Sequence, residues 1–194
     1  MGHKVTTPPA TEPVTLAEAR AHLKVDGNEE DPYIESLIAA ARESCEVFQG
    51  RAYVEQTITL KLDEFPCNGR IEIPRPPLIS IESLTYVDGL GDPQELDEDE
   101  DFYVDDSSEN CPTVLLPAYG KSWPSIRSEP GAITIVYKAG YGAGAVPKST
   151  KQAILFLVGH WFENREAVNV GNLVTELPIG VDRLLLHHKV YTIP

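Results

Sequence analysis

Cysteine is scarce in this sequence, and its spacing excludes several classes of site. The 194 residues contain three cysteines, Cys45, Cys67 and Cys111, and no Cys-x-x-Cys pair. An odd number of widely separated cysteines fits neither a disulfide framework nor a zinc or dithiol redox motif. We therefore expect three reduced thiols, with Cys45 a small apolar residue of a core.

Long apolar runs are also missing. A helix that crosses a bilayer needs roughly 18 consecutive apolar residues, whereas the longest candidate, residues 153–159, is followed at once by His160 and soon by Glu163. Residues 1–13 include Lys4 but no apolar stretch, which is typical of a flexible arm and not of a signal peptide. The sequence therefore predicts a soluble protein made in the cytoplasm.

Basic residues are few. Thirty Asp and Glu residues against 16 Lys and Arg give a formal net charge of −14. This argues against ordinary nucleic-acid binding, because phosphate contacts need clustered Lys and Arg. Most of the excess is local, since Asp88–Glu109 holds eleven acidic residues and no basic one. Two interpretations stand: a solvated loop, or a surface that repels DNA and lets it slide without adhering.

Two helices are predicted near the N-terminus. Thr15 and Glu18 have the spacing of a capping box, which predicts a helix over residues 16–23. A second helix is predicted over residues 31–49, ending before Gly50. Its apolar residues recur at steps of three, four and seven, as on one face of an amphipathic helix: Ile34, Leu37, Ile38, Ala41, Cys45 and Phe48. The polar residues Glu35, Arg42, Glu43 and Glu46 lie off that face.

From residue 52 the pattern changes to the alternation of strands. Ile58, Leu60 and Leu62 alternate with polar residues, as in a half-buried strand. The apolar residues of segment 79–87 change phase along its length, which predicts a bulge near Ser83. Short strands are further predicted at residues 71–73, 102–104, 113–116 and 132–137, and the proline-rich corner 74–77 marks a turn or an edge. The spacing favours an antiparallel β region.

The last part of the chain is predicted to be helical again. A helix over residues 147–164 is apolar nearly all round and so needs burial on more than one side. A short helix over residues 178–186 ends in three leucines, which also need a partner. We therefore predict an α+β fold, a small helical bundle body with an inserted antiparallel β region. Its parts are a flexible N-terminal arm (1–13), the first part of the helical body (14–51), the β region (52–146), and the second part of the body with a C-terminal docking tail (147–194).

Nucleotide-binding motifs are matched only in part. The phosphate-loop pattern G-x-x-x-x-G-K-[ST] can be laid over residues 142–149, but Pro147 stands where the second glycine should supply an N–H. A G-x-G-x-x-G/A pattern at residues 140–145 lacks the parallel βαβ context that gives it meaning. The plainer interpretation is a flexible glycine-rich turn between sheet and helix.

Metal-binding and nucleophile motifs are equally weak. His160 and Glu163 lie one helical turn apart, with His187 and His188 further on, but two ligands at that spacing are common by chance. There is no G-x-S-x-G motif. The sequence therefore predicts no catalytic residue, no cofactor and no metal, and hence a protein that is not an enzyme.

A series of short segments, taken in order, is similar to one protein family. The segments are 14–23 (VTLAEARAHL), 50–51 (GR), 76–81 (PPLISI) with Tyr86 and Asp88-Gly89, 102–105 (FYVD), 123–124 (WP), 131–142 (GAITIVYKAGYG), 146–147 (VP), 151–154 (KQAI), 160–166 (HWFENRE) and 177–185 (LPIGVDRLL). Together they resemble the gp6-like head-tail connector (adaptor, head-completion) proteins of long-tailed phages and prophages. The resemblance spans nearly the whole chain.

The resemblance implies a structural protein of the virion neck, at the head-tail interface. Such proteins form a homo-oligomeric ring of about a dozen subunits below the portal, close the DNA-filled head, and dock the next neck or tail-completion protein. DNA passes through the channel without specific binding, and neither membrane nor cofactor takes part. An alternative from a different class is a monomeric soluble protein-interaction or regulatory domain.

Two candidate sites follow from this implied role. The apolar C-terminal residues are expected to dock onto the portal, unless they fold back on the preceding helix: Leu184, Leu185, Leu186, Val190 and Tyr191. Five consecutive acidic residues are expected to face the channel, where their charge would repel DNA phosphates: Asp97, Glu98, Asp99, Glu100 and Asp101. The long acidic stretch 92–106 departs from the family pattern, so its place in a ring does not carry over from the resemblance.

Overall fold

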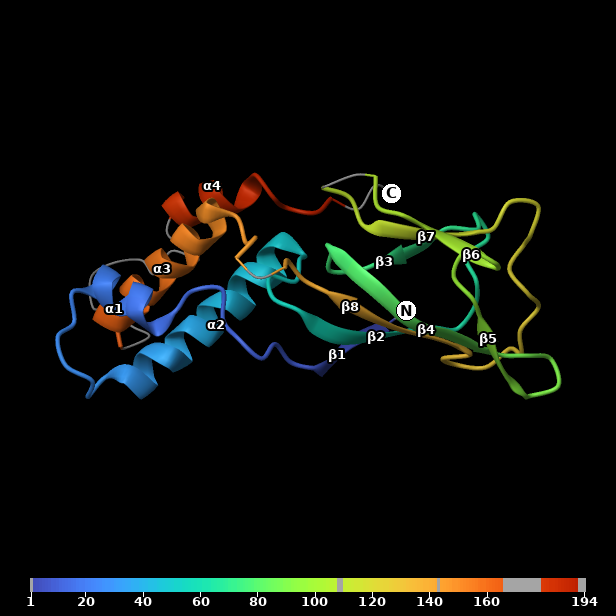
Figure 1. Cartoon of the computed structure of the whole chain (residues 1–194), viewed down its shortest axis with the longest axis horizontal. Helices are drawn as coiled ribbons and strands as arrows, with labels where there is room; N and C mark the ends of the chain where they lie inside the picture. The colour runs from blue at the N-terminus through green and yellow to red at the C-terminus, as the bar shows by residue number, and fades with distance from the viewer. Residues whose placement is uncertain (1, 108–109, 143, 166–178, 192–194) are drawn as a thin grey trace.

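The computed structural model describes residues 2–107, 110–142, 144–165 and 179–191. Helices gather at one end of the molecule and strands at the other (Figure 1). The helical body consists of α1 (Leu16–Leu23), α2 (Asp31–Gln49), α3 (Lys148–Glu163) and α4 (Ile179–Leu186). The strands β2 to β8 lie between α2 and α3 in the sequence, so the fold is α+β with an inserted β region, as predicted.

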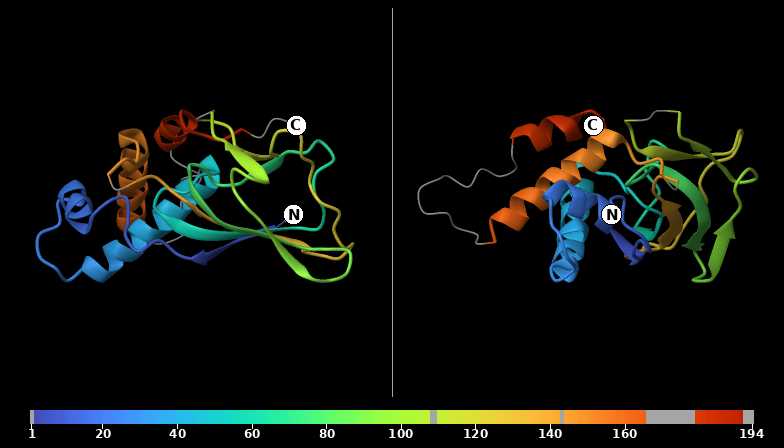
Figure 2. Two further views of the ribbon diagram at one scale, coloured as in Figure 1. Left: turned by 45° about the vertical axis from the view of Figure 1, so that its right-hand side comes forward. Right: turned by 60° about the vertical axis from the view of Figure 1, so that its left-hand side comes forward.

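Two antiparallel sheets make up the β region (Figure 2). The larger sheet has the order β1-β2-β8-β4-β5, with the bounds Gly2–Thr7, Gln56–Leu62, Ile133–Ala139, Leu78–Val87 and Pro93–Leu96. The smaller has the order β3-β7-β6, with the bounds Ile71–Ile73, Thr113–Pro117 and Phe102–Asp105. The predicted bulge is confirmed, because the register of β4 against β8 shifts between Ile81 and Ser83 and again between Leu78 and Ser80.

The N-terminal segment differs from the flexible arm that the sequence predicts. Residues 2–7 form strand β1, which pairs along β2. Val5 packs against the β-region core, and the hydroxyls of Thr6 and Thr59 are hydrogen-bonded at 2.7 Å. One inward apolar residue leaves no readable alternation, which is why the composition alone suggested an arm. The sequence also did not predict strand β5, because this strand lies inside the acidic stretch and shows no alternation of apolar and polar residues.

Buried apolar residues form two clusters, one in each half of the molecule. The helical cluster includes Ile34, Ala41, Leu157, Val181 and Leu185. The β cluster lies where the two sheets face each other and includes Ile58, Leu60, Leu115, Ile135 and Tyr137. Helix α3 packs against α1, α2 and α4, so that neighbours inside the subunit cover most of its apolar surface. Phe156 is the exception, at 42% exposure.

The N-terminal cap of α1 matches the sequence prediction, whereas the glycine turn after β8 differs from it in one respect. The capping box at α1 is present, with the Glu18 N–H donating to the Thr15 hydroxyl at 3.2 Å and the Thr15 N–H donating to the Glu18 carboxylate at 2.7 Å. Gly140, after β8, has a φ of +138°, and a Cβ there would lie 2.4 Å from the carbonyl oxygen of Val54. This glycine therefore serves a close backbone contact, so the glycine-rich turn is not freely flexible at that position.

Candidate functional site

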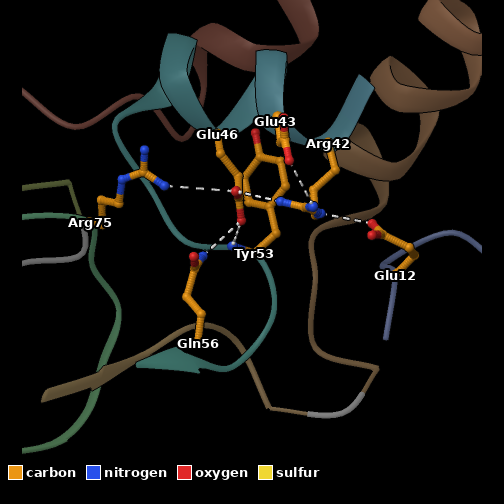
Figure 3. A network of polar contacts seen from close by, with 7 residues as sticks. All are labelled: Glu12, Arg42, Glu43, Glu46, Tyr53, Gln56 and Arg75. Carbon is orange, nitrogen blue, oxygen red and sulfur yellow. Dashed lines mark hydrogen bonds and ion pairs between the residues drawn. The ribbon is translucent and has the colours of Figure 1, made fainter. Parts of the chain in front are cut away.

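A buried carboxylate joins the helical body to the β region (Figure 3). Glu46, near the end of α2, is 2% exposed. Its Oε1 accepts hydrogen bonds from the Tyr53 backbone N–H at 2.8 Å and from the Gln56 side-chain amide at 3.1 Å. Its Oε2 lies 3.0 Å from Nη1 of Arg42 and 3.9 Å from Nη1 of Arg75. One side chain of α2 is thus bound to the chain entering β2 and to the corner between β3 and β4.

The Arg42 guanidinium extends this network towards the N-terminal linker. Its Nε donates to the Glu12 carboxylate at 2.8 Å, and its Nη2 lies 3.5 Å from the exposed Glu43. Burial alone would lower the pKa of Arg42, but the hydrogen bond with Glu12 and the charge on Glu46 raise that pKa above its ordinary value. Burial raises the pKa of the Glu46 carboxyl, and the Tyr53 N–H and Arg42 oppose that change.

The sequence places Arg42 and Glu46 off the apolar face of α2, where solvent contact is expected. Both are instead buried, because the β region and residues 12–14 cover that side of the helix. Their spacing of four residues allows an ion pair within the helix, but it is equally common on exposed helices. The missing signal was therefore the second buried face of α2, which only the tertiary structure reveals.

The C-terminal helix is held on the body by a chain of buried polar contacts. The Tyr53 hydroxyl donates to Oε1 of Gln49 at 2.5 Å, and Nε2 of Gln49 donates to the carbonyl of Leu185 at 2.5 Å. The side chain of Leu185 is fully buried in the helical cluster. The Leu185 side chain thus lies in the core of its own subunit.

Residues 187–191 continue from α4 as a strap across to the β region. The Val190 N–H donates to the carbonyl of Gln49 at 2.8 Å, and the Tyr191 N–H donates to the carbonyl of Asn110 at 3.1 Å. Arg51 fixes the strap from beneath, with its Nε donating to the carbonyl of His188 and its Nη2 donating to Oδ1 of Asn110 at 3.0 Å.

The other predicted docking residues differ in their exposure. Leu186 and Tyr191 are 47% and 54% exposed, whereas Leu184 and Val190 are half-buried. The Lys189 ammonium lies 4.5 Å from the centre of the Phe48 ring of α2. Leu186 lies where the strap begins and Tyr191 where it ends, and these two are the predicted docking residues most open to contact.

The acidic loop joins β5 to β6 at the end of the molecule away from the helices (Figure 1). Residues 97–100 are exposed. Asp101 has a different role, since its carboxylate accepts from the Lys121 ammonium at 2.9 Å and from the Asp97 N–H at 3.1 Å. These two hydrogen bonds lower the pKa of Asp101. Asp101 thus shapes the loop, and the other four predicted residues carry its outward charge.

The phosphate-loop and metal motifs considered in the sequence lie near the two ends of α3. Pro147 is the N-cap of α3 and makes no side-chain cap bond. His160 lies beside Asn164 at the end of α3, and in the part of the chain that the structure describes, no three His, Cys, Asp or Glu side chains are grouped as metal ligands. No helix among the described ranges has the length and apolar character needed to cross a membrane.

Solved structures with this fold include chains of gene transfer agent particles. A chain of the "Virion of native gene transfer agent (GTA) particle" matches with a TM-score of 0.80 at 21% identity, covering 100% of this chain and 98% of that one. A chain of the "Neck of empty GTA particle computed with C6 symmetry" gives 0.79 at 22%, and one of the "Neck of native GTA particle computed with C12 symmetry" gives 0.78 at 21%, both with the same coverage. At these identities the likeness establishes a shared fold over the full length.

The sequence itself matches a family over most of its length. Among curated proteins none matches significantly. The profile of the family described as "Head completion protein" matches residues 12–172. This range contains α1 to α3, both sheets except β1, and every residue of the Glu46 network. Since the match spans far more than half of the 194 residues, the chain belongs to the head completion protein family.

Proposed function

We propose that this protein is a structural head-tail connector of a tailed phage or a related particle. In this role, subunits form a ring of about a dozen copies in the neck, below the portal, where they close the DNA-filled head and offer a docking surface to the tail. The protein does no chemistry: its task is to hold its place while DNA passes through the channel.

The observation that carries this proposal is the family match over residues 12–172. The full-length likeness to chains of neck structures computed with C6 and C12 symmetry supports a ring. The joint inside the subunit also suits the role. Glu46 and the C-terminal strap tie the two halves together through buried polar contacts, which favour one fixed arrangement over an adaptable one.

The test of the ring is the mass of the assembly with and without the portal. Native mass spectrometry and electron microscopy of the purified protein, mixed with portal rings, should show closed rings of this chain seated on the portal. A protein that stays monomeric at high concentration and leaves the portal bare would overturn the proposal, and would favour the monomeric interaction domain instead.

The C-terminal docking site remains part of the proposal, and the exposure of each residue decides its role there. Leu186 and Tyr191 are its anchors, Leu184 and Val190 support them, and Leu185 holds α4 to the body. The double variant Leu186→Ser and Tyr191→Ser should lose portal binding and keep its folded core. Leu90→Ser is the matched control, since Leu90 is 89% exposed in the β4–β5 turn. Equal portal binding by the unchanged protein, the double variant and Leu90→Ser would refute the docking assignment.

The acidic loop is proposed to face the channel or its rim. Its exposed charges would keep DNA phosphates from adhering, but only within about 8 Å at physiological salt. The test replaces Glu98, Asp99 and Glu100 with Gln, Asn and Gln, and keeps Asp101, which shapes the loop. Particles with this variant should assemble normally and eject DNA more slowly, most clearly at low salt. Normal ejection at every salt concentration would leave the loop a solvated surface.

A further inference from the structure

The larger sheet has two open edges. Strand β1 forms one edge and β5 the other, and within the described residues each is hydrogen-bonded to a strand on one side only. Five of the six residues of β1 and three of the four of β5 are exposed. An edge strand presents a row of unpaired N–H and C=O groups, which pair readily with a strand of another chain.

The two edge strands, β1 and β5, lie at the same level along the strand direction and run the same way. The register connects them through one row of paired residues: Leu96 of β5, Leu84, Ile135, Leu60 and His3 of β1. All four pairings between the five strands are antiparallel, so β1 and β5 run parallel to each other. A second copy placed beside the first, in the same orientation, would bring its β1 next to β5 at matching height.

The two edges also carry opposite charge. Lys4 is exposed on β1, Lys61 lies opposite Gly2 on the neighbouring strand, and residues 2–11 contain no carboxylate. Strand β5 carries the exposed Glu95 and leads directly into Asp97 and the acidic loop. His3 and Leu96 lie at the same level along the strand direction. The residues that follow them, Lys4 and Asp97, therefore also lie at one level.

We propose that copies of this chain join head to tail by β-sheet extension, with β5 of one copy parallel to β1 of the next and Lys4 facing Asp97 across the contact. This inference rests on the proposed function, because a ring of identical subunits needs two different, complementary patches on each subunit. Main-chain hydrogen bonds between the edges would supply affinity. The opposite charges would set the order, since two acidic edges repel and disfavour a symmetric β5–β5 dimer.

Disulfide trapping tests this contact directly. Neighbouring strands lie about 4.8 Å apart, within the Cα separation that a disulfide spans. In a chain with Cys67 and Cys111 replaced by serine, Lys4→Cys combined with Asp97→Cys should give, on oxidation of the assembled protein, a ladder of covalent oligomers on a denaturing gel. Each single-cysteine variant should give at most a dimer. The pair Lys148→Cys with Asp97→Cys is the control and should give no ladder, since Lys148 is exposed at the start of α3.

Charge exchange gives a second readout that does not depend on oxidation. Lys4→Asp should raise the dissociation constant of assembly roughly five- to tenfold at low salt, and adding Asp97→Lys should restore it. Lys148→Asp makes the same change of net charge in the helical body and should have little effect. Thermal unfolding of each variant checks that the subunit is intact.

The outcomes separate this inference from the proposed function. Rings that form without the ladder, and in which Lys4→Asp behaves like Lys148→Asp, overturn the edge contact and leave the connector role intact. Monomers under every condition, with the portal present, overturn both. A ladder together with rescue by the exchanged charges supports the contact.

Discussion

Removing the charge of Glu46 should weaken the whole subunit. The variant Glu46→Gln keeps the shape of the side chain and an oxygen that accepts from Tyr53 and Gln56, but it takes the counter-charge from Arg42 and Arg75. Breaking a buried ion pair costs about 3–5 kcal/mol. Burial disfavours the charge of Glu46 itself, and Arg42 keeps its bond to Glu12 at 2.8 Å, so we expect the lower end, about 3 kcal/mol.

The assay is urea unfolding of this variant beside a matched control. Glu43→Gln removes a carboxylate that lies 3.5 Å from the same guanidinium, but the Glu43 side chain is 71% exposed. A surface pair of this kind contributes at most about 1 kcal/mol. For a chain of this size, a loss of about 3 kcal/mol lowers the melting temperature by about 6 to 12 °C.

A third variant separates charge from hydrogen bonding. Glu46→Ala also leaves the Tyr53 N–H and the Gln56 amide without their acceptor, which adds about 1–3 kcal/mol for each buried donor that water fails to reach. The expected order of stability is therefore Glu43→Gln, then Glu46→Gln, then Glu46→Ala. If Glu46→Gln and Glu43→Gln unfold at the same urea concentration, the carboxylate is not a joint between the two halves and the reasoning is wrong.

Three further predictions concern other parts of the subunit. Gly140→Ala should cost more than about 2 kcal/mol, because its Cβ would meet the Val54 backbone at 2.4 Å, whereas Gly142→Ala has open space and should be nearly neutral in the same melts. Burial raises the pKa of the Cys45 thiol to about 12, so at pH 8 iodoacetamide should label the exposed Cys67 and reach Cys45 only after unfolding; equal labelling rates in the folded protein would contradict this. Arg51→Ala should speed hydrogen exchange at the Val190 and Tyr191 amides, since it releases the carbonyl of His188 and the side chain of Asn110, and unchanged exchange would mean that Arg51 does not hold the strap.

The elements that the sequence predicts well are those with strong local signals. The capping box at Thr15 and the apolar face of α2 fix two helices, and the change of phase near Ser83 reveals a bulge. These features arise from contacts within a few residues or from one buried face, so that a short stretch of sequence contains the whole signal.

The parts that were missed depend on partners far away in the chain. Strand β1 exists because β2 lies beside it, with paired residues at least fifty positions apart in the sequence. The burial of Glu46 depends on the β region covering α2, and the role of Leu185 depends on Gln49 and the helical cluster. No pattern in a single sequence specifies which distant segments meet, so the candidate docking and acidic residues could be named by type but not placed.

The path of the chain between the two halves limits how a subunit can deform. Within the described residues, four stretches cross from one half to the other: the linker from β1 to α1, residues 50–55, residues 140–142 with 144–147, and the strap at 187–191. In a hinge motion, two parts of a protein rotate relative to each other, and the backbone angles of a few connecting residues absorb the change. Because four crossings surround a shared buried joint, we expect the two halves to move as one block. A ring built from these subunits would therefore widen or narrow only by sliding one rigid block against the next.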